Sequence, residues 1–197
     1  PKLKTVCLPK AFHSYSDISY SRRCCVSGVM RDIGALAKHP NLPKHNQKAN
    51  VKSIGEWLSL RSSVIRIVVD GGVNDPDLTE LDLSRFSKLR TFEIGDNCFG
   101  FVVAFKLVGL SKLNRVIIGK HCFTYHTDNT QTCRFCVKEC PKLKVLKIGP
   151  CSFSHYSVCE IEKVDALEVM EIGYLNKISD NFDHASLELK SEFILNA

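Results

Sequence analysis

A group of cysteines with one nearby histidine is the part of this sequence best suited to chemistry. Cys133 and Cys136 have the spacing of half a zinc site, and His121, Cys122 and Cys140 are close in the chain. A structural zinc ion needs four converging ligands, and no second Cys-x-x-Cys pair is present. The repeats described below also assign these positions to a core and a strand, so we predict no metal and no cofactor.

Two other pairs of reactive side chains invite a catalytic interpretation. Cys24 and Cys25 follow two arginines, whose charge lowers the pKa of a nearby thiol. A cysteine hydrolase also needs a base and a third group that orients the base, and no local signature identifies them. Glu160 and Glu162 alternate along a predicted strand and are typical of a solvated edge. We predict a protein that is not an enzyme; a zinc or cysteine enzyme is the third hypothesis.

The elements that position these residues are repeats. The pattern of Leu89–Phe99 returns at Leu113–Phe123 and Leu143–Phe153, and in weaker form at Leu167–Lys177. The Ile-Gly pairs inside these repeats begin at positions 94, 118, 148 and 172, which are steps of 24, 30 and 24 residues. A period of this length with apolar residues at fixed offsets is typical of a stacked repeat protein. We expect the first repeat at residues 64–88.

Each repeat has a second apolar segment, such as Leu81-Asp82-Leu83 or Phe105-Lys106-Leu107, that alternates inward and outward residues as a short strand does. One repeat cannot bury its apolar side alone, whereas stacked neighbours form a continuous core. The Gly of each Ile-Gly pair marks a sharp turn. It permits either positive φ or the close approach of backbone from the next coil.

Several cysteines occupy positions that other repeats fill with different residues. Cys98 and Cys122 are equivalent to Ser152, and Cys140 falls where other repeats have Leu or Val. Cysteine at such positions is expected to act as a small apolar filler. Reduced thiols of this kind favour an intracellular, cytoplasmic location. The chain also has no run of about 18 apolar residues, so we predict no membrane span.

The front of the chain differs from the repeats. We predict a basic N-terminal region over residues 1–53 and a solenoid with a C-terminal cap over residues 54–197. Ser16-Asp17 are suited to cap a helix that runs towards Lys38 and covers the open end of the core. The polar segment 39–50 is expected to be a linker, and apolar residues from Leu187 to Leu195 are expected to close the far end.

The net charge of +6 is unevenly distributed. Residues 1–62 contain 11 Lys/Arg and 3 Asp/Glu, whereas the remainder contains 16 and 18. The basic character therefore belongs to the front segment and not to the repeats. The alternative function is binding of an anionic partner, nucleic acid or a membrane surface, through residues 1–52. The expected phosphate contacts are Arg22, Arg23, Lys44, Lys48 and Lys52.

Residues 89–99, Leu-x-x-Phe-x-Ile-x-x-Asn-x-Phe, resemble the signature of leucine-rich repeats, Leu-x-x-Leu-x-Leu-x-x-Asn/Cys-x-Leu. The repeats that start at Leu113 and Leu143 resemble it too, with His121 and Cys151 at the Asn position. The resemblance covers about residues 64–195. It implies an α/β repeat protein that is mostly β: a curved solenoid with a parallel sheet on its concave face and short extended segments on its convex face. It also implies a protein-binding role.

In such a solenoid the outward residues of the inner strands form columns across the sheet, and concave sheets are the usual contact surface. The third repeat is six residues longer, and its extra length falls in the polar loop 124–132. The predicted function is a non-catalytic protein-interaction module that uses the sheet face and this loop. The predicted contact residues are Thr91, Glu93, Asp96, Arg115, Ile117, Lys120, Lys147, Glu171 and Tyr174, with Val145 and Val169 in the first column and Tyr125 and His126 in the loop.

Overall fold

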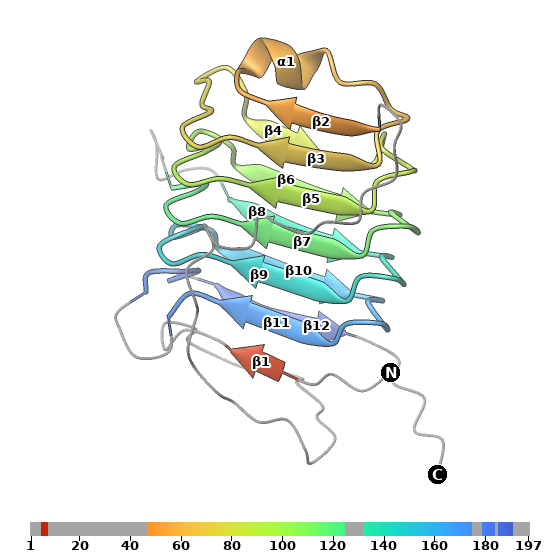
Figure 1. Ribbon diagram of the computed structural model, residues 1–197. Helices are drawn as coiled ribbons and strands as arrows, with labels where there is room; N and C mark the ends of the chain where they lie inside the picture. Colours follow the sequence, from red (N-terminus) through yellow and green to blue (C-terminus); the bar gives the residue numbers. More distant parts are fainter. Residues whose placement is uncertain (1–4, 8–46, 125–131, 175–178, 184, 191–197) are drawn as a thin grey trace.

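A computed structural model describes residues 5–7, 47–124, 132–174, 179–183 and 185–190 of this chain. The described residues form a stack of coils, and each complete coil adds one strand to each of two parallel sheets (Figure 1). Sheet A has the order β1-β11-β9-β7-β5-β3-β2, and sheet B has the order β12-β10-β8-β6-β4. Every strand pair in both sheets is parallel, as each coil returns in the same direction.

The strands are short and recur at the predicted repeat period. The strands of sheet A are β1 (Thr5–Cys7), β2 (Lys48–Val51), β3 (Arg66–Val69), β5 (Thr91–Ile94), β7 (Arg115–Ile118), β9 (Val145–Ile148) and β11 (Val169–Ile172). Those of sheet B are β4 (Glu80–Asp82), β6 (Ala104–Val108), β8 (Arg134–Lys138), β10 (Val158–Glu162) and β12 (Ser186–Lys190). The stacked repeat architecture is therefore confirmed.

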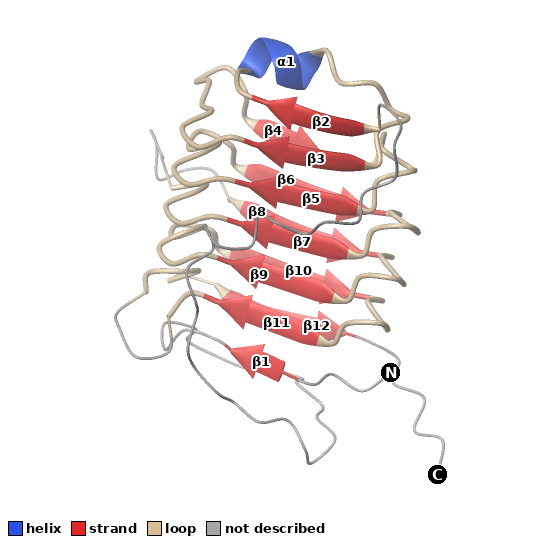
Figure 2. Ribbon diagram, in the orientation of Figure 1, coloured by secondary structure: helices blue, strands red, loops and turns tan. Residues whose placement is uncertain are grey.

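One feature of the predicted fold class needs correction, and one is made more definite. The expected α/β character is wrong for the described residues, which contain one helix of five residues, α1 (Ile54–Leu58) (Figure 2). The short extended segments expected on the far side are strands that hydrogen-bond into sheet B. Both follow from the alternating apolar residues in each second segment, which favour a paired strand over a helix. No helix among the described residues is long and apolar enough to cross a membrane.

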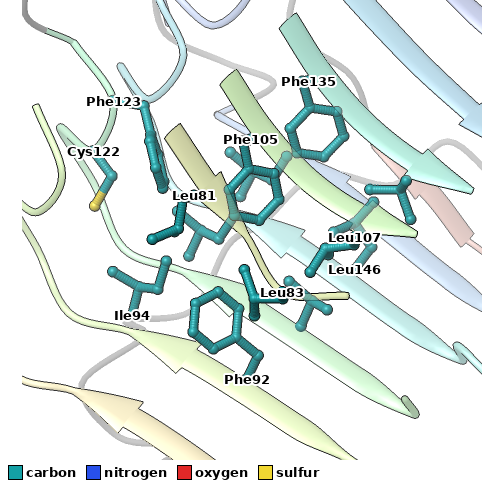
Figure 3. Packing of buried hydrophobic residues seen from close by; sticks show 14 of the residues in the cluster. Leu81, Leu83, Phe92, Ile94, Phe105, Leu107, Cys122, Phe123, Phe135 and Leu146 are labelled. Carbon is teal, nitrogen blue, oxygen red and sulfur yellow. The ribbon is translucent and has the colours of Figure 1, made fainter. Parts of the chain in front are cut away.

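The register of sheet A places equivalent residues of successive repeats side by side. Ile94 pairs with Ile118, Ile118 with Ile148, and Ile148 with Ile172, and each of the four is at most 2% exposed. These residues and the inward residues of sheet B fill the space between the sheets (Figure 3). The core is thus one column of matching side chains per inward position, as the repeat pattern predicts.

Aromatic rings stack along the axis of the coils. The centroids of Phe99 and Phe123 are 5.8 Å apart, those of Phe123 and Phe153 are 4.4 Å apart, and those of Phe153 and Phe182 are 5.3 Å apart. All four residues have φ between 53° and 59°, a left-handed conformation that costs roughly 1–2 kcal/mol without glycine. Each ring is buried, and burying a large apolar side chain contributes about 2–3 kcal/mol of favourable free energy, which offsets that cost.

The glycines of the Ile-Gly pairs are required by close approach of the next coil. A Cβ on Gly95 would lie 2.6 Å from Gly71 N, one on Gly119 2.6 Å from the Gly95 carbonyl, and one on Gly149 2.5 Å from the Gly119 carbonyl. These three do not have positive φ, whereas Gly173, in the last repeat, has φ of +62°. Of the two expected reasons for glycine, close backbone contact therefore applies to the repeats that contain Gly95, Gly119 and Gly149.

The two ends of sheet A are closed by different segments. Ser53 caps α1, and Trp57 packs its ring edge-on against Phe99 at 5.6 Å, covering the first coil. Strand β1 pairs with β11 at the opposite end, so the front of the chain lies beside the last repeat (Figure 1). The helix expected between residues 18 and 38 lies outside the described residues. The linker expected over residues 39–50 is wrong at its end, because Lys48–Val51 is a strand of sheet A.

The far end of the predicted cap is described in part. Leu187 in β12 is fully buried and belongs to the core, where it pairs with Cys159 of β10. Phe193 and Leu195 lie outside the described residues. Asn181 closes the last turn, because its Nδ2 donates to the carbonyls of Gly149 and Ser152 at 2.8 Å each.

The coil contact at Gly119 predicts a specific loss of stability. Gly119→Ala should lower the free energy of unfolding by roughly 2–3 kcal/mol, because its methyl group would overlap the backbone of Gly95. The matched control is Gly55→Ala in α1, where the nearest atom to the new Cβ is 3.9 Å away and alanine favours the helix. Urea denaturation followed by circular dichroism measures both. Equal stability of Gly119→Ala and the native chain would contradict the contact.

Candidate interaction surface

The outer face of sheet A, defined as the outward side chains of β2, β3, β5, β7, β9 and β11, carries two columns. The register confirms that the predicted neighbours are aligned across β5, β7, β9 and β11. The first column also includes Lys48 and Arg66, and the second also includes Asn50 and Val68. The first column is Lys48, Arg66, Thr91, Arg115, Val145 and Val169; the second is Asn50, Val68, Glu93, Ile117, Lys147 and Glu171.

Two ion pairs join neighbouring strands on this face. Arg66 donates to Glu93 at 2.7 Å, and Lys147 lies 2.7 Å from Glu171. Their side chains are between 14% and 22% exposed, so these pairs are better shielded from solvent than most surface pairs. The Nε of Arg66 is buried and has no hydrogen-bond partner in the part of the chain that the structure describes.

Two predicted contact residues at the centre of the face differ from one another. Ile117 points away from the core between Glu93 and Lys147, yet it is only 3% exposed and offers almost no surface of its own. Arg115, at the start of the same strand, is partly exposed and has no ion pair among the described residues. Arg115 is therefore the most available charged side chain at the middle of the sheet.

The predicted contact residues outside the strands lie in different environments. Asp96 accepts a hydrogen bond from Lys120 N at 2.9 Å, and its carboxylate lies 3.6 Å from Lys120 Nζ. This pair links the turns of two coils and so has a structural role. Tyr174 is 38% exposed at the last turn. Tyr125 and His126 lie outside the described residues.

The predicted phosphate contacts of the basic front segment are described in part. Lys48 lies on β2 and Lys52 precedes α1, and both are exposed. Arg22, Arg23 and Lys44 lie outside the described residues. The described members therefore belong to the first coil of the stack.

The equivalent positions 98, 122 and 152 form a ladder of hydrogen-bond donors. The Cys98 thiol donates to the Asp70 carbonyl at 3.1 Å, and the Cys122 thiol donates to the Gly95 carbonyl at 3.1 Å. The Ser152 hydroxyl donates to the Gly119 carbonyl at 2.8 Å. The expected burial of these positions is confirmed, and each side chain in addition satisfies a turn carbonyl of the preceding coil. The alternation of Cys with Ser was the signal that a donor is required.

The candidate zinc ligands are distributed over different parts of the coil. Cys133 is buried, whereas Cys136 lies on the outer face of β8 between inward Phe135 and Val137. Cys122 follows β7 and Cys140 follows β8, so these two lie at opposite edges of the coil. The structure does not bring the four thiols together.

Burial also determines the chemistry of the described thiols. It raises the pKa of Cys122 well above its usual value, raises that of Cys140 to about 11 and raises that of Cys159. Cys98 differs, because its interaction with the neighbouring Cys122 side chain lowers its pKa, but its own side chain is fully buried. Three of these four thiols are therefore protonated at neutral pH, and all four are hidden from solvent.

The carboxylates of Glu160 and Glu162 point outward from β10 towards one lysine of the neighbouring strand. Lys138 Nζ lies 3.2 Å from Glu160 and 3.5 Å from Glu162. These hydrogen-bond and charge interactions, opposed by partial burial, raise the pKa of Lys138. The arrangement neutralises charge on the outer face of sheet B, in line with the expected solvated edge.

The burial of the thiols predicts an order of alkylation. Among the cysteines between residues 47 and 174, iodoacetamide at neutral pH should modify Cys151 first, because it is partly exposed. Cys136 should follow more slowly, since burial raises its pKa and lowers its thiolate fraction. Peptide mass spectrometry over time measures the order. Rapid modification of Cys122 or Cys159 in the folded protein would contradict the structure, and unfolding in urea provides the control.

Comparison of this chain with protein-family models, with curated proteins and with solved structures gives no match.

Proposed function

We propose that this chain is a non-catalytic protein-interaction module, a solenoid of the leucine-rich-repeat type, whose outer face of sheet A is the contact surface. The observation that carries the proposal is the arrangement of this face. It combines a rigid parallel sheet, aligned columns of mixed charge and partly buried valines, and one buried arginine donor without an acceptor. In this proposal sheet A is the concave sheet of the solenoid.

The repeat signature supports the leucine-rich-repeat assignment. Its first three apolar positions are buried in each full repeat, as with Leu89, Phe92 and Ile94. The Asn position of the signature is occupied by Asn97, His121 and Cys151, and all three have φ between 52° and 57°. Asparagine is favoured at such positive φ, which gives the signature residue a physical reason in this chain. The second sheet in place of helices makes the solenoid an unusually strand-rich member of this type.

Several properties of the face suit protein recognition. Arginine is enriched among the hot-spot residues that contribute most of the binding energy of protein interfaces. Both Arg66 and Arg115 lie in the first column. Val145 and Val169 continue that column and supply apolar area beside the charges. Because adjacent strands fix the spacing, the partner meets a preorganised surface, which lowers the entropy cost of binding. The proposal also includes the polar loop 124–132, of which residues 125–131 lie outside the described residues.

Charge reversal at the centre of the face tests this proposal. Arg115→Glu should weaken binding of a partner by about tenfold or more, because it removes a cation and places a carboxylate in the column. The partner is first identified by affinity purification of the tagged chain from its native source and then titrated by calorimetry.

The matched control is Arg134→Glu on sheet B. Arg134 is also the first residue of its strand and points outward, so both variants change the net charge equally. Equal affinities of the two variants would exclude the outer face of sheet A. A thermal melt of each variant establishes that the fold is retained.

A further inference from the structure

The turns that lead from sheet B back to sheet A carry an excess of positive charge. We define the turn ridge as residues 83–90, 109–114 and 139–144, which link the sheets in three successive coils along the right-hand edge in Figure 1. It contains six Lys/Arg and a single acid, Glu139. The six cations are Arg85, Lys88, Arg90, Lys112, Lys142 and Lys144, and all six are exposed.

Three lysines occupy the same position in these turns. Lys88, Lys112 and Lys142 each precede a buried leucine whose N–H closes the turn, at distances of 2.8, 3.0 and 3.0 Å. Neighbouring parallel strands are about 4.8 Å apart, so the backbones that carry these lysines recur at roughly that interval. The result is a row of ammonium groups on a narrow edge of the molecule.

Most of this charge is not neutralised within the protein. Most described lysines on the sheet faces lie in ion pairs, as Lys106 with Glu80 and Lys147 with Glu171 do, whereas Lys48 on β2 has no ion pair among the described residues. Lys88, Arg90, Lys112 and Lys142, by contrast, form no ion pair with any residue that the structure describes. Neighbouring like charges without counter-charges destabilise the folded state by mutual repulsion, but they favour solubility and attract anionic partners.

The opposite edge has the opposite sign. The described turns from sheet A to sheet B between β3 and β10 carry four carboxylates, Asp70, Asp75, Asp77 and Asp96, against one lysine, Lys120. The turn ridge ends before the turn between β10 and β11, because that turn contains the acidic residues Asp165 and Glu168. The net positive charge still belongs to residues 1–62, but the repeats carry basic and acidic residues on different edges, which totals along the chain conceal.

The other exposed side chains of the ridge identify the kind of anion. The uncharged ones are Ser84, Ser87, Ser111 and Asn114, together with Pro141; the remaining one is Glu139, which pairs with Lys163. Ser, Asn, Lys and Arg are the side chains that bind phosphate oxygens. Protein interfaces are depleted in Lys and need aromatic or apolar anchors, which the ridge lacks. Single strands are held by stacking on aromatic rings, also absent here, and a membrane favours a broad patch with apolar side chains that insert.

We propose that the turn ridge binds the phosphate backbone of a double-stranded nucleic acid without reading its bases. The lysine row contacts phosphates along one strand, and the serine and asparagine side chains add hydrogen bonds. This surface lies on the edge of the stack, so it is separate from the outer face of sheet A and does not depend on that face binding a protein.

Salt dependence of duplex binding tests the proposal with the full chain. Fluorescence anisotropy of a labelled 20-base-pair duplex, titrated at several KCl concentrations, should give a log–log slope of about −4 to −5 if the ridge contacts four to six phosphates. The triple variant Lys88→Ala, Lys112→Ala, Lys142→Ala should reduce that slope by about three and weaken binding at low salt by about tenfold or more. Two duplexes of unrelated sequence should bind with the same affinity and the same salt dependence.

Matched variants separate the ridge from overall charge. Lys106→Ala, Lys120→Ala, Lys190→Ala removes the same three charges elsewhere and should leave the slope unchanged. Lys88→Arg, Lys112→Arg, Lys142→Arg should retain binding. Alanine is tolerated at this turn position, since Ala166 occupies it in the next coil. Single alanine variants, each expected to reduce the slope by about one, provide the same measurement should the triple variant unfold.

Three results would overturn the proposal. The first is absence of duplex binding by the native chain at low salt. The second is an unchanged slope in the ridge variant, which would place nucleic-acid binding in residues 1–52. The third is tighter binding of a single strand, or of vesicles that contain phosphatidylserine, than of the duplex.

Discussion

Successive coils approach most closely at the turn where each strand of sheet A ends, and the rest of the structure depends on that contact. A side chain beyond hydrogen at Gly95, Gly119 or Gly149 would overlap the backbone of the coil before it. The same turn leaves carbonyls that point along the stack, and position 98, 122 or 152 donates to them. Buried carbonyls without a partner are costly, so glycine and the donor are required together.

This contact also explains why the coils tolerate strained residues. Two residues after each glycine, Asn97 or its equivalent adopts positive φ, and a phenylalanine two positions later does the same. Each of these conformations is unfavourable alone. They turn the chain so that the phenylalanine ring enters the core and stacks on the ring of the coil before it. Stacking across coils therefore makes the turn geometry of one repeat depend on that of its neighbours.

The sequence predicted the features that depend on period and alternation. It aligned Ile94 with Ile118, assigned the columns of sheet A, and located the second segment of each repeat. It did not reveal that these segments pair into a sheet, because extended and paired segments share the same alternation. It also did not distinguish a thiol that fills space from one that donates, since both are buried. The burial of Ile117 on the outer face was missed because outward alternation alone implies exposure.

The ends of the stack were harder to predict, for a different physical reason. A cap has no neighbouring repeat to match, so the period carries no information about it. Trp57 and the short helix α1 cover one end, and β1 reaches the other through pairing with β11, far away in the sequence. Parallel pairing between distant segments leaves no local pattern beyond an ordinary apolar strand. Residues 5–7 therefore gave no signal of their place in sheet A.

Repetition converts a single position into an extended row of side chains, so one small fold can present two different surfaces, a sheet face and the turn ridge. A residue type repeated at one position becomes a row with a spacing of about 4.8 Å, set by the hydrogen bonds between strands. On the sheets, residues of opposite charge on neighbouring strands pair, as Arg66 does with Glu93 and Lys147 with Glu171. On the turn ridge the neighbouring positions are serine and asparagine, so the lysine row has no internal partner. The sheet faces are thus suited to matched, partly buried contacts, and the ridge to long-range attraction of an anion, because only unpaired charge extends its field into solvent.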